Sequence, residues 1–206
     1  MIRLITFDLD NTLWQTDPVI MAAERACYQW LQQNVPAVTQ LYDLAGLFEY
    51  KRLLLQSYPD WHFQLTKLRF ETYRRVIMQA GCGSAKANQL AEDLMQVFHQ
   101  YRNRVTLYPD VDQTLTYLAE HFSLMTITNG NSDLKIVGID HLFKQHFSAE
   151  TSGAAKPDPR MFQQAMAAAA VTPEETLHIG DHALQDVAAA QQLGLRTAWF
   201  NPDGKQ

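Results

Sequence analysis

Two aspartates, Asp8 and Asp10, directly follow the apolar run at residues 2–7. If the chain stays extended past that run, side chains two residues apart point the same way. Two close carboxylates repel each other, and a hard cation such as Mg²⁺ offsets the repulsion while also binding phosphate oxygens. A carboxylate screened in this way can attack phosphorus. The pair therefore predicts phosphoryl chemistry, in which Asp8 attacks and Asp10 exchanges protons with the ester oxygen and with water.

Polar residues also follow three later segments of the chain: Thr128 with Asn129, Lys156, and Asp181. Asp181 can supply a further carboxylate, so that a metal held by Asp8 and Asp181 would position a phosphoryl group. The hydroxyl of Thr128 and the ammonium of Lys156 would hold the non-bridging oxygens and offset developing charge. Each motif alone is weak, but their order along the chain favours one site.

The elements that must position these residues alternate between short apolar runs and amphipathic segments. The predicted strands are residues 2–7, 123–128, 147–149, 176–179 and 196–200. The predicted helices between them are residues 112–121, 158–170 and 183–193, the last of which stops at Gly194. Such alternation predicts an α/β fold, a Rossmann-like parallel sheet with helices on both faces. Ligands of open parallel sheets bind at the carboxyl ends of the strands, where the polar residues stand.

Residues 15–105 interrupt the alternation, because no period-two strand pattern occurs there. The segment predicts amphipathic helices instead, at residues 19–33, 40–56, 63–80 and 85–102. We therefore expect a catalytic core formed by residues 1–14 and 106–206, with an all-helical cap domain inserted at residues 15–105. Among the aromatic residues of this region and its borders, we expect Trp14 to line the pocket.

Composition narrows the class of protein. The chain has 206 residues, a formal net charge of -5 and 47% hydrophobic residues, which is enough for a proper core. The acidity argues against nucleic acid as a partner, and the absence of a long apolar stretch argues against a membrane span. No signal-peptide pattern occurs, so we expect a cytoplasmic monomer or homodimer acting on a small phosphorylated metabolite. Cys27 and Cys82 have no metal or redox spacing.

The ordered set of motifs resembles the haloacid dehalogenase-like hydrolase superfamily, in its phosphatase branch with a helical cap. That resemblance implies Asp8 as nucleophile, Asp10 as acid and base, and Mg²⁺ as cofactor. It also implies a metal held by Asp8, Asp181 and the backbone carbonyl of Asp10. Asp186 would support the metal site or orient the lysine. The residues implied to contact the substrate phosphate are Thr12, Thr128, Asn129 and Lys156.

A narrower resemblance, to bacterial phosphatases acting on flavin mononucleotide and related ribityl phosphates, involves residues 61–81, TITNGN and the C-terminal WFNPDG. The chain departs from the superfamily at His182, where an acidic or small polar residue is commoner. Two other functions remain open. One is a haloacid dehalogenase, whose aspartate attacks carbon without a metal. The other is a non-catalytic binding protein on the same fold.

Overall fold

The computed structural model describes residues 1–202 and 204, so residues 203, 205 and 206 of the predicted core domain lie outside the described residues. The chain divides into two compact units. The first, here called the sheet unit, comprises Met1–Thr16 and Val105–Gln206. The second, here called the helical unit, is Asp17–Arg104. The sequence boundaries proposed above, 14/15 and 105/106, fall close to these divisions.

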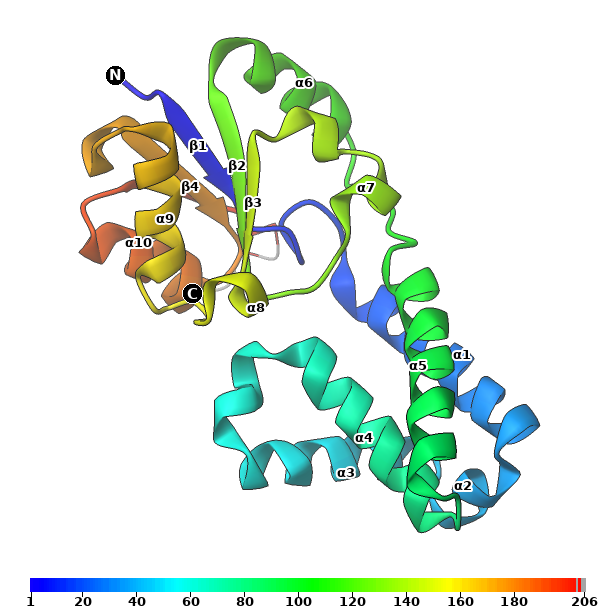
Figure 1. Cartoon of the computed structure of the whole chain (residues 1–206). Coiled ribbons are helices and arrows are strands. Elements are labelled where there is room, and N and C mark those ends of the chain that lie inside the picture. Colours follow the sequence, from blue (N-terminus) through cyan, green and yellow to red (C-terminus); the bar gives the residue numbers. More distant parts are fainter. Residues whose placement is uncertain (203, 205–206) are drawn as a thin grey trace. The chain divides into compact units, whose positions relative to one another are not determined.

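The sheet unit is built on five parallel strands, most of which are visible side by side in Figure 1. They are β1 Leu4–Phe7, β2 Ser123–Thr128, β3 Gln145–Ser148, β4 Thr176–Gly180 and β5 Arg196–Trp199. The strand order is β3-β2-β1-β4-β5, so the first strand lies in the centre between the two strands that carry Thr128 and Gly180. The predicted α/β class with a parallel sheet is confirmed.

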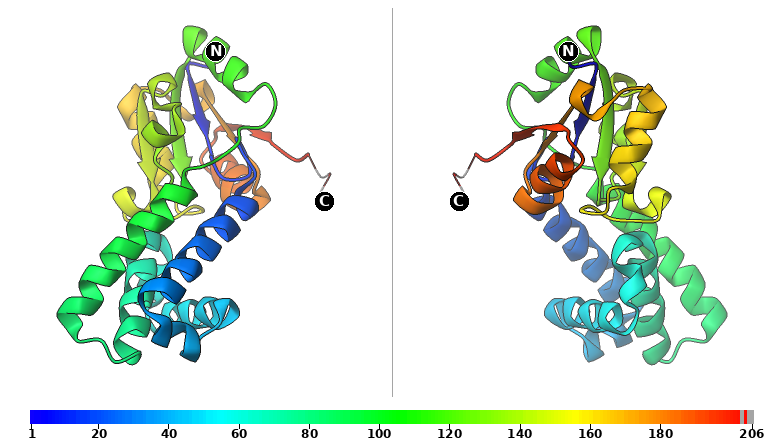
Figure 2. Two further views of the ribbon diagram at one scale, coloured as in Figure 1. Left: turned by 90° about the vertical axis from the view of Figure 1, so that its right-hand side faces the viewer. Right: turned by 90° about the vertical axis from the view of Figure 1, so that its left-hand side faces the viewer.

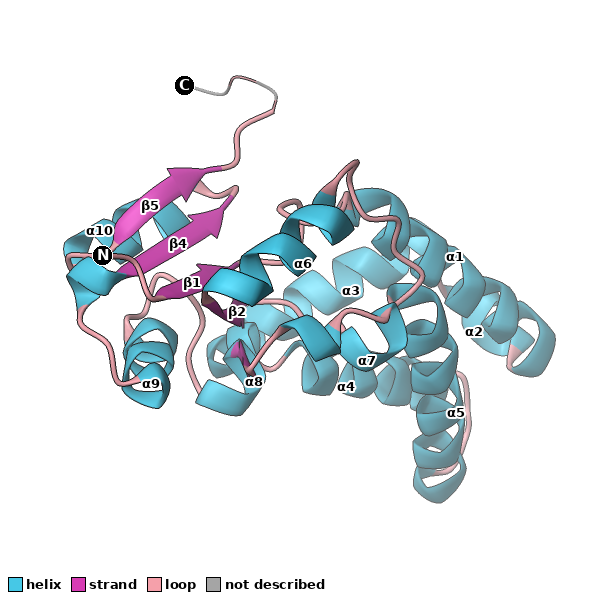
Figure 3. Ribbon diagram, turned by 90° about the horizontal axis from the view of Figure 1, so that it is seen from above, coloured by secondary structure: helices cyan, strands magenta, loops and turns pink. Residues whose placement is uncertain are grey.

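Helices cover both faces of this sheet, as Figure 3 shows. They are α6 Val111–His121, α7 Leu134–Val137, α8 Ala149–Ser152, α9 Arg160–Ala169 and α10 Ala189–Gln192. Ile5 and Phe7 pack on the α6 face, in a cluster with Leu115. On the opposite face the ring of Phe162 from α9 meets the His178 ring edge-on at 4.9 Å. The alternation of side chains along a strand explains this division.

Two elements differ from their predicted bounds for local reasons. Strand β3 ends at Ser148 rather than beyond it, because the Ser148 and Thr151 side chains form a capping box that starts α8. The predicted helix at 183–193 begins as a π-helical turn at Ala183–Ala188, which continues into α10. Gly194 ends it with a φ of +84°, a left-handed conformation that glycine adopts without strain. Figure 2 shows β5, in red, at the edge of the sheet.

The helical unit is helical throughout, as predicted from its sequence pattern. Its elements are α1 Thr16–Asn34, α2 Pro36–Leu41, α3 Leu44–Ser57, η1 Pro59–Phe63, α4 Leu65–Gln79 and α5 Ser84–Arg102. The helix predicted at 40–56 is present as α3, but it starts later than predicted, because Asp43 accepts a 2.7 Å bond from the Gly46 amide and caps the helix there. No helix in the described part of the chain is long and apolar enough to cross a membrane.

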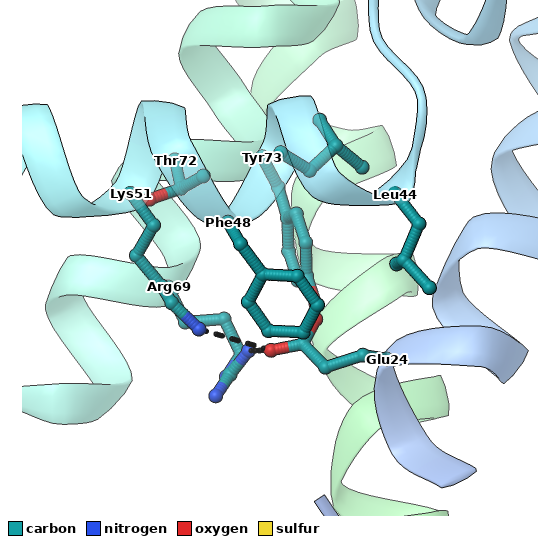
Figure 4. Close-up of a pocket in the computed structure, with 8 residues that line it drawn as sticks. Glu24, Leu44, Phe48, Lys51, Arg69, Thr72 and Tyr73 are labelled. Carbon is teal, nitrogen blue, oxygen red and sulfur yellow. Dashed lines mark hydrogen bonds and ion pairs between the residues drawn. The ribbon is translucent and has the colours of Figure 1, made fainter. Parts of the chain in front are cut away.

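A buried charged cluster joins three helices of the helical unit (Figure 4). The carboxylate of Glu24 in α1 accepts bonds from Lys51 Nζ in α3, at 3.0 Å, and from the guanidinium of Arg69 in α4. The Arg69 guanidinium also lies 3.6 Å from the centre of the Phe98 ring. Burial alone would raise the pKa of Glu24, but Arg69 and Lys51 outweigh it and lower that pKa.

Candidate active site

The carboxyl ends of β1, β2 and β4 carry the polar residues that the sequence singled out. Asp8 directly follows β1, and its amide donates a 2.8 Å hydrogen bond to the carbonyl of Ile179 in β4. Thr128 is the last residue of β2, and Gly180, the last of β4, precedes Asp181. Parallel strands bring these ends to one edge of the sheet.

Lys156 is the centre of the site, although the loop that carries it is far from Asp8 in the sequence. Its ammonium lies 2.6 Å from Asp8 Oδ1 and 2.5 Å from Asp186 Oδ1, and it donates a 2.9 Å bond to the carbonyl of Ile127. The lysine is only 3% exposed. A buried ammonium needs this many acceptors, so its three hydrogens are all engaged.

The charges of these three groups depend on one another. Burial opposes the charge of Lys156, but Asp8 and Asp186 outweigh burial and raise its pKa. Burial would also raise the pKa of Asp186, yet Lys156 and His178 lower it. The pKa of Asp8 is raised by burial, against the influence of Lys156 and with a further contribution from Asp186. Asp186 therefore stays ionised, whereas the ionised form of Asp8 would be stabilised by any additional positive charge nearby.

Asp186 is fixed by donors on both of its oxygens. Its Oδ1 receives His178 Nε2 at 3.1 Å as well as Lys156, and its Oδ2 receives the amide of His182 at 2.9 Å. A Cβ at Gly180 would lie 2.4 Å from the Asp186 Cγ, so this approach requires glycine there. The π-helical turn that begins at Ala183 carries Asp186 into the site, as such turns often do in functional regions.

Three carboxylates form a candidate metal site: Asp8, Asp181 and Asp186 can each place one oxygen within 4.8 Å of the others. Oxygen-only donors suit a hard divalent cation such as Mg²⁺. Asp181 is half-buried, and its carbonyl accepts a 2.9 Å bond from Trp199 Nε1 in β5. Burial and the nearby Asp186 raise the pKa of Asp181. These residues fit the cation that the resemblance implies.

Asp10 does not join that carboxylate group, and the expectation that it points the same way as Asp8 rested on an extended chain. The chain instead turns after Leu9, whose carbonyl accepts the amide of Leu13 at 2.8 Å. Asp10 Oδ1 receives Trp14 Nε1 at 3.0 Å and Thr16 Oγ1 at 2.8 Å. The expectation that Trp14 lines the pocket was wrong, because the residue is 0% exposed and packs in the core.

Two of the residues expected to contact phosphate are threonines whose hydroxyls lie close to the ends of neighbouring strands. Thr128 is buried, and its Oγ1 accepts the Gly130 amide at 2.9 Å, which leaves its own hydrogen available to donate. Thr12 donates a 3.3 Å bond to Asp8 Oδ2. Thr128 is therefore the last residue of β2, and Thr12 lies in the turn that follows β1.

The side chain of Asn129 was expected to contact phosphate, but its polar atoms are hydrogen-bonded to other residues. Its Oδ1 accepts the Lys156 amide at 2.7 Å, and its Nδ2 donates to the Lys156 carbonyl at 3.0 Å. The remaining Nδ2 hydrogen meets Gln185 Oε1 at 3.1 Å. Both hydrogens of the amide are therefore used, and the Asn129 side chain clamps the backbone of the lysine loop.

Sequence reasoning missed several residues that complete the site. From the sequence, no role was assigned to His178, Gln185 or Trp199. His178 is 1% exposed, and its Nδ1 lies 2.8 Å from the hydroxyl of Thr6. A polar residue in the middle of an otherwise apolar strand was the one available signal. Burial lowers its pKa, so the ring is neutral and donates from Nε2 to Asp186.

A family model described as haloacid dehalogenase-like hydrolase matches residues 2–194. The chain belongs to this family. Among curated haloacid dehalogenase-like hydrolases, it is 34% identical over 235 residues to the phosphoserine phosphatase of Thermus thermophilus, with 97% of this chain and 88% of that protein covered. It is 29% identical over 202 residues to the 5-amino-6-(5-phospho-D-ribitylamino)uracil phosphatase of Escherichia coli, with 98% and 84% covered.

A solved structure in the same family is also similar to this hydrolase. The crystal structure of a 2-haloacid dehalogenase from Pseudomonas syringae pv. Tomato is 39% identical and superposes with a TM-score of 0.95, covering 100% of this chain and 89% of that one. The solved structure agrees with this chain in fold, and the family model identifies a hydrolase. Some of these relatives are named phosphatases and one is named a dehalogenase, so the chemistry of the site is needed to distinguish the two activities.

Proposed function

We propose that this haloacid dehalogenase-like hydrolase is a Mg²⁺-dependent phosphatase, which hydrolyses a small phosphate monoester through an aspartyl-phosphate on Asp8. One observation carries the proposal. The site has a group of carboxylates around Asp8 and, separately, the carboxyl of Asp10 held by Trp14 and Thr16. Ester hydrolysis needs both a screened nucleophile and a group that protonates the leaving oxygen. Displacement of a halide needs neither a cation nor a proton donor.

Each residue of the site has a separate role in the proposed reaction. Asp8 attacks phosphorus as the bond to the ester oxygen breaks, and Asp10 gives its proton to that oxygen, which leaves as an alcohol. Asp10 then takes a proton from water, whose oxygen attacks the phosphorus and releases Asp8. The Thr128 hydroxyl contacts a non-bridging oxygen, and the positive charge of Lys156, whose hydrogens are bonded to Asp8, Asp186 and the Ile127 carbonyl, offsets the negative charge that develops at the site. Mg²⁺ bound by Asp8, Asp181 and the Asp10 carbonyl would screen the charges of the nucleophile and the phosphoryl group.

The compounds that name the curated relatives support one class of substrate. Phosphoserine and the ribitylamino-uracil phosphate are phosphate monoesters of primary alcohols, and so is the glyceraldehyde 3-phosphate of a Pyrococcus furiosus relative. An alkoxide is a poor leaving group, which makes a proton donor such as Asp10 necessary. We propose a primary alkyl phosphate as substrate.

Dehalogenation is the second candidate, because the 39% identical solved structure carries that name. One pair of assays separates the two functions. Purified protein with Mg²⁺ is incubated with 4-nitrophenyl phosphate and a panel of primary alkyl phosphates, and released phosphate is measured. The same protein is incubated with 2-chloropropionate, and released chloride is measured. Chloride release without phosphate release would overturn the proposal.

A further inference from the structure

The side chain of Asn129 binds both backbone polar groups of Lys156. Its Oδ1 accepts the Lys156 amide at 2.7 Å, and its Nδ2 donates to the Lys156 carbonyl at 3.0 Å. A backbone amide can only donate and a backbone carbonyl can only accept, so these two partners settle the orientation of the Asn129 side chain. Two bonds to one residue fix both the position and the direction of the Lys156 backbone.

Gln185 takes up the remaining hydrogen of the Asn129 amide. Its Oε1 lies 3.1 Å from Asn129 Nδ2. Gln185 is half-buried and belongs to the π-helical turn Ala183–Ala188, which also carries Asp186. That turn therefore reaches both ends of Lys156. Asp186 bonds its ammonium, and Gln185 bonds the side chain that holds its backbone.

The place of the Lys156 ammonium depends on where its backbone is held. A lysine carries its charge on a flexible four-carbon stem, so the stem alone does not fix the charge. Here one ammonium meets three acceptors at once: Asp8 Oδ1 at 2.6 Å, Asp186 Oδ1 at 2.5 Å and the Ile127 carbonyl at 2.9 Å. A displaced backbone would lengthen at least one of these bonds, and the bond to Asp8 involves the proposed nucleophile.

We propose that Asn129 and Gln185 are positioning residues, which hold the backbone of Lys156 so that its ammonium stays against Asp8. The inference rests on the proposed phosphatase function, because it assigns a task within that reaction. Both hydrogens of the Asn129 amide are engaged by Lys156 and Gln185, so the side chain acts on the lysine rather than on phosphate. Gln185 acts on Lys156 backbone geometry through Asn129.

Two kinetic signatures distinguish this role from a general loosening of the site. The three hydrogens of the Lys156 ammonium are bonded within the protein, so its misalignment should slow the chemical step and leave substrate binding nearly unchanged. A lower kcat with an unchanged KM is the mark of such an effect, whereas loosening would alter both constants. The second signature is non-additivity, because two residues that act through one contact cannot lose it twice.

The test measures kcat and KM for 4-nitrophenyl phosphate with Mg²⁺ in the wild type, Gln185→Leu, Asn129→Ala and the double variant. We expect Gln185→Leu to lower kcat about fivefold, the equivalent of one neutral hydrogen bond, and Asn129→Ala to lower it about 100-fold, since three bonds are lost. The double variant should be no slower than Asn129→Ala.

Gln191→Leu is the matched control for Gln185→Leu. Gln191 also makes one side-chain hydrogen bond in the sheet unit, from its Nε2 to Thr197 Oγ1 at 3.0 Å, and it is exposed. This substitution removes a bond of the same kind away from Lys156, so kcat should stay that of the wild type. Equal losses of kcat in Gln191→Leu and Gln185→Leu would overturn the inference.

A double variant about fivefold slower than Asn129→Ala would also overturn it, because Gln185 would then act independently of Asn129. An unchanged kcat in Gln185→Leu, or a loss seen only in KM, would do the same. Circular dichroism checks the fold of each variant. If Asn129→Ala is unfolded, Asn129→Asp replaces it in the cycle, because its carboxylate still accepts the Lys156 amide but has no hydrogen for Gln185. A wild type that releases no phosphate contradicts the proposed function itself, so the two failures are distinguishable.

Discussion

The ammonium of Lys156 and the Oδ1 of Asp8 lie 2.6 Å apart in a buried site, although 148 positions separate the two residues in the sequence. The same ammonium reaches Asp186 at 2.5 Å. One cation between two carboxylates leaves a net negative charge, which a divalent cation at Asp8 and Asp181 would balance.

Asp8→Asn should abolish turnover and leave the fold intact. The amide is nearly the same shape as the carboxylate, but it cannot form the acyl phosphate, so kcat should fall by roughly 10³-fold or more. Steady-state kinetics with 4-nitrophenyl phosphate measures the loss, and thermal unfolding by circular dichroism checks the fold. Activity within a few-fold of the wild type would remove Asp8 from the nucleophilic role.

Activity should require added Mg²⁺ and disappear in excess chelator, and Ca²⁺ should inhibit. Mg²⁺ demands tight octahedral coordination, whereas Ca²⁺ takes more and longer contacts and could engage both oxygens of Asp8. Asp181→Asn should raise the Mg²⁺ concentration needed for half-maximal rate, because one charged ligand is lost. Phosphate release is measured across a Mg²⁺ titration in both proteins. An unchanged requirement in the variant would exclude Asp181 from the metal site.

Lys156→Met should destabilise the protein by about 3–5 kcal/mol, because Asp8 and Asp186 are then left buried without their cation. Adding Asp8→Asn to this variant removes one of the stranded charges, so the double variant should be more stable than the sum of the single effects predicts. The expected coupling is about 0.5–3 kcal/mol. Urea unfolding of the four proteins in this cycle gives the value. Strict additivity would mean that the pair does not interact in solution.

Glu24→Gln should lower stability at neutral pH, because Lys51 and Arg69 lose the carboxylate between them. The lowered pKa of Glu24 means that its stabilising charge is fully present above the unfolded pKa of about 4.3 and is lost as pH falls through the folded pKa. The difference from the wild type should therefore shrink in acid.

Glu49→Gln is the matched control for this last variant. Glu49 also pairs with an arginine, Arg52, but both side chains are more than half exposed. A solvated pair contributes little, so this substitution should leave stability nearly unchanged. Denaturant midpoints of all three proteins from pH 3 to pH 7 make the comparison. A Glu49→Gln loss as large as that of Glu24→Gln would show that burial of the cluster is not what makes it stabilising.

The sequence by itself determined the class of the fold and the edge of the sheet where the polar residues gather. Short apolar runs followed by polar residues, as at Asp8, Thr128 and Asp181, are typical of buried strands, and parallel strands put their carboxyl ends together. Helical periodicity likewise identified the inserted unit, since that pattern is local. These features depend on residues close in the chain, so they can be predicted without contacts.

Only the tertiary structure decided what each polar side chain touches. The turn after Leu9 directs Asp10 toward Trp14 and Thr16, and that turn overrides the extended geometry that the spacing of Asp8 and Asp10 suggested. Asn129 reaches the backbone of Lys156, across 27 positions of the chain, rather than standing free for phosphate. His178 bonds to Thr6 from a neighbouring strand. A buried polar group forms its hydrogen bond with a group that lies near it in space, because it must have a partner. The local periodicity of the sequence does not indicate which groups become neighbours in this way.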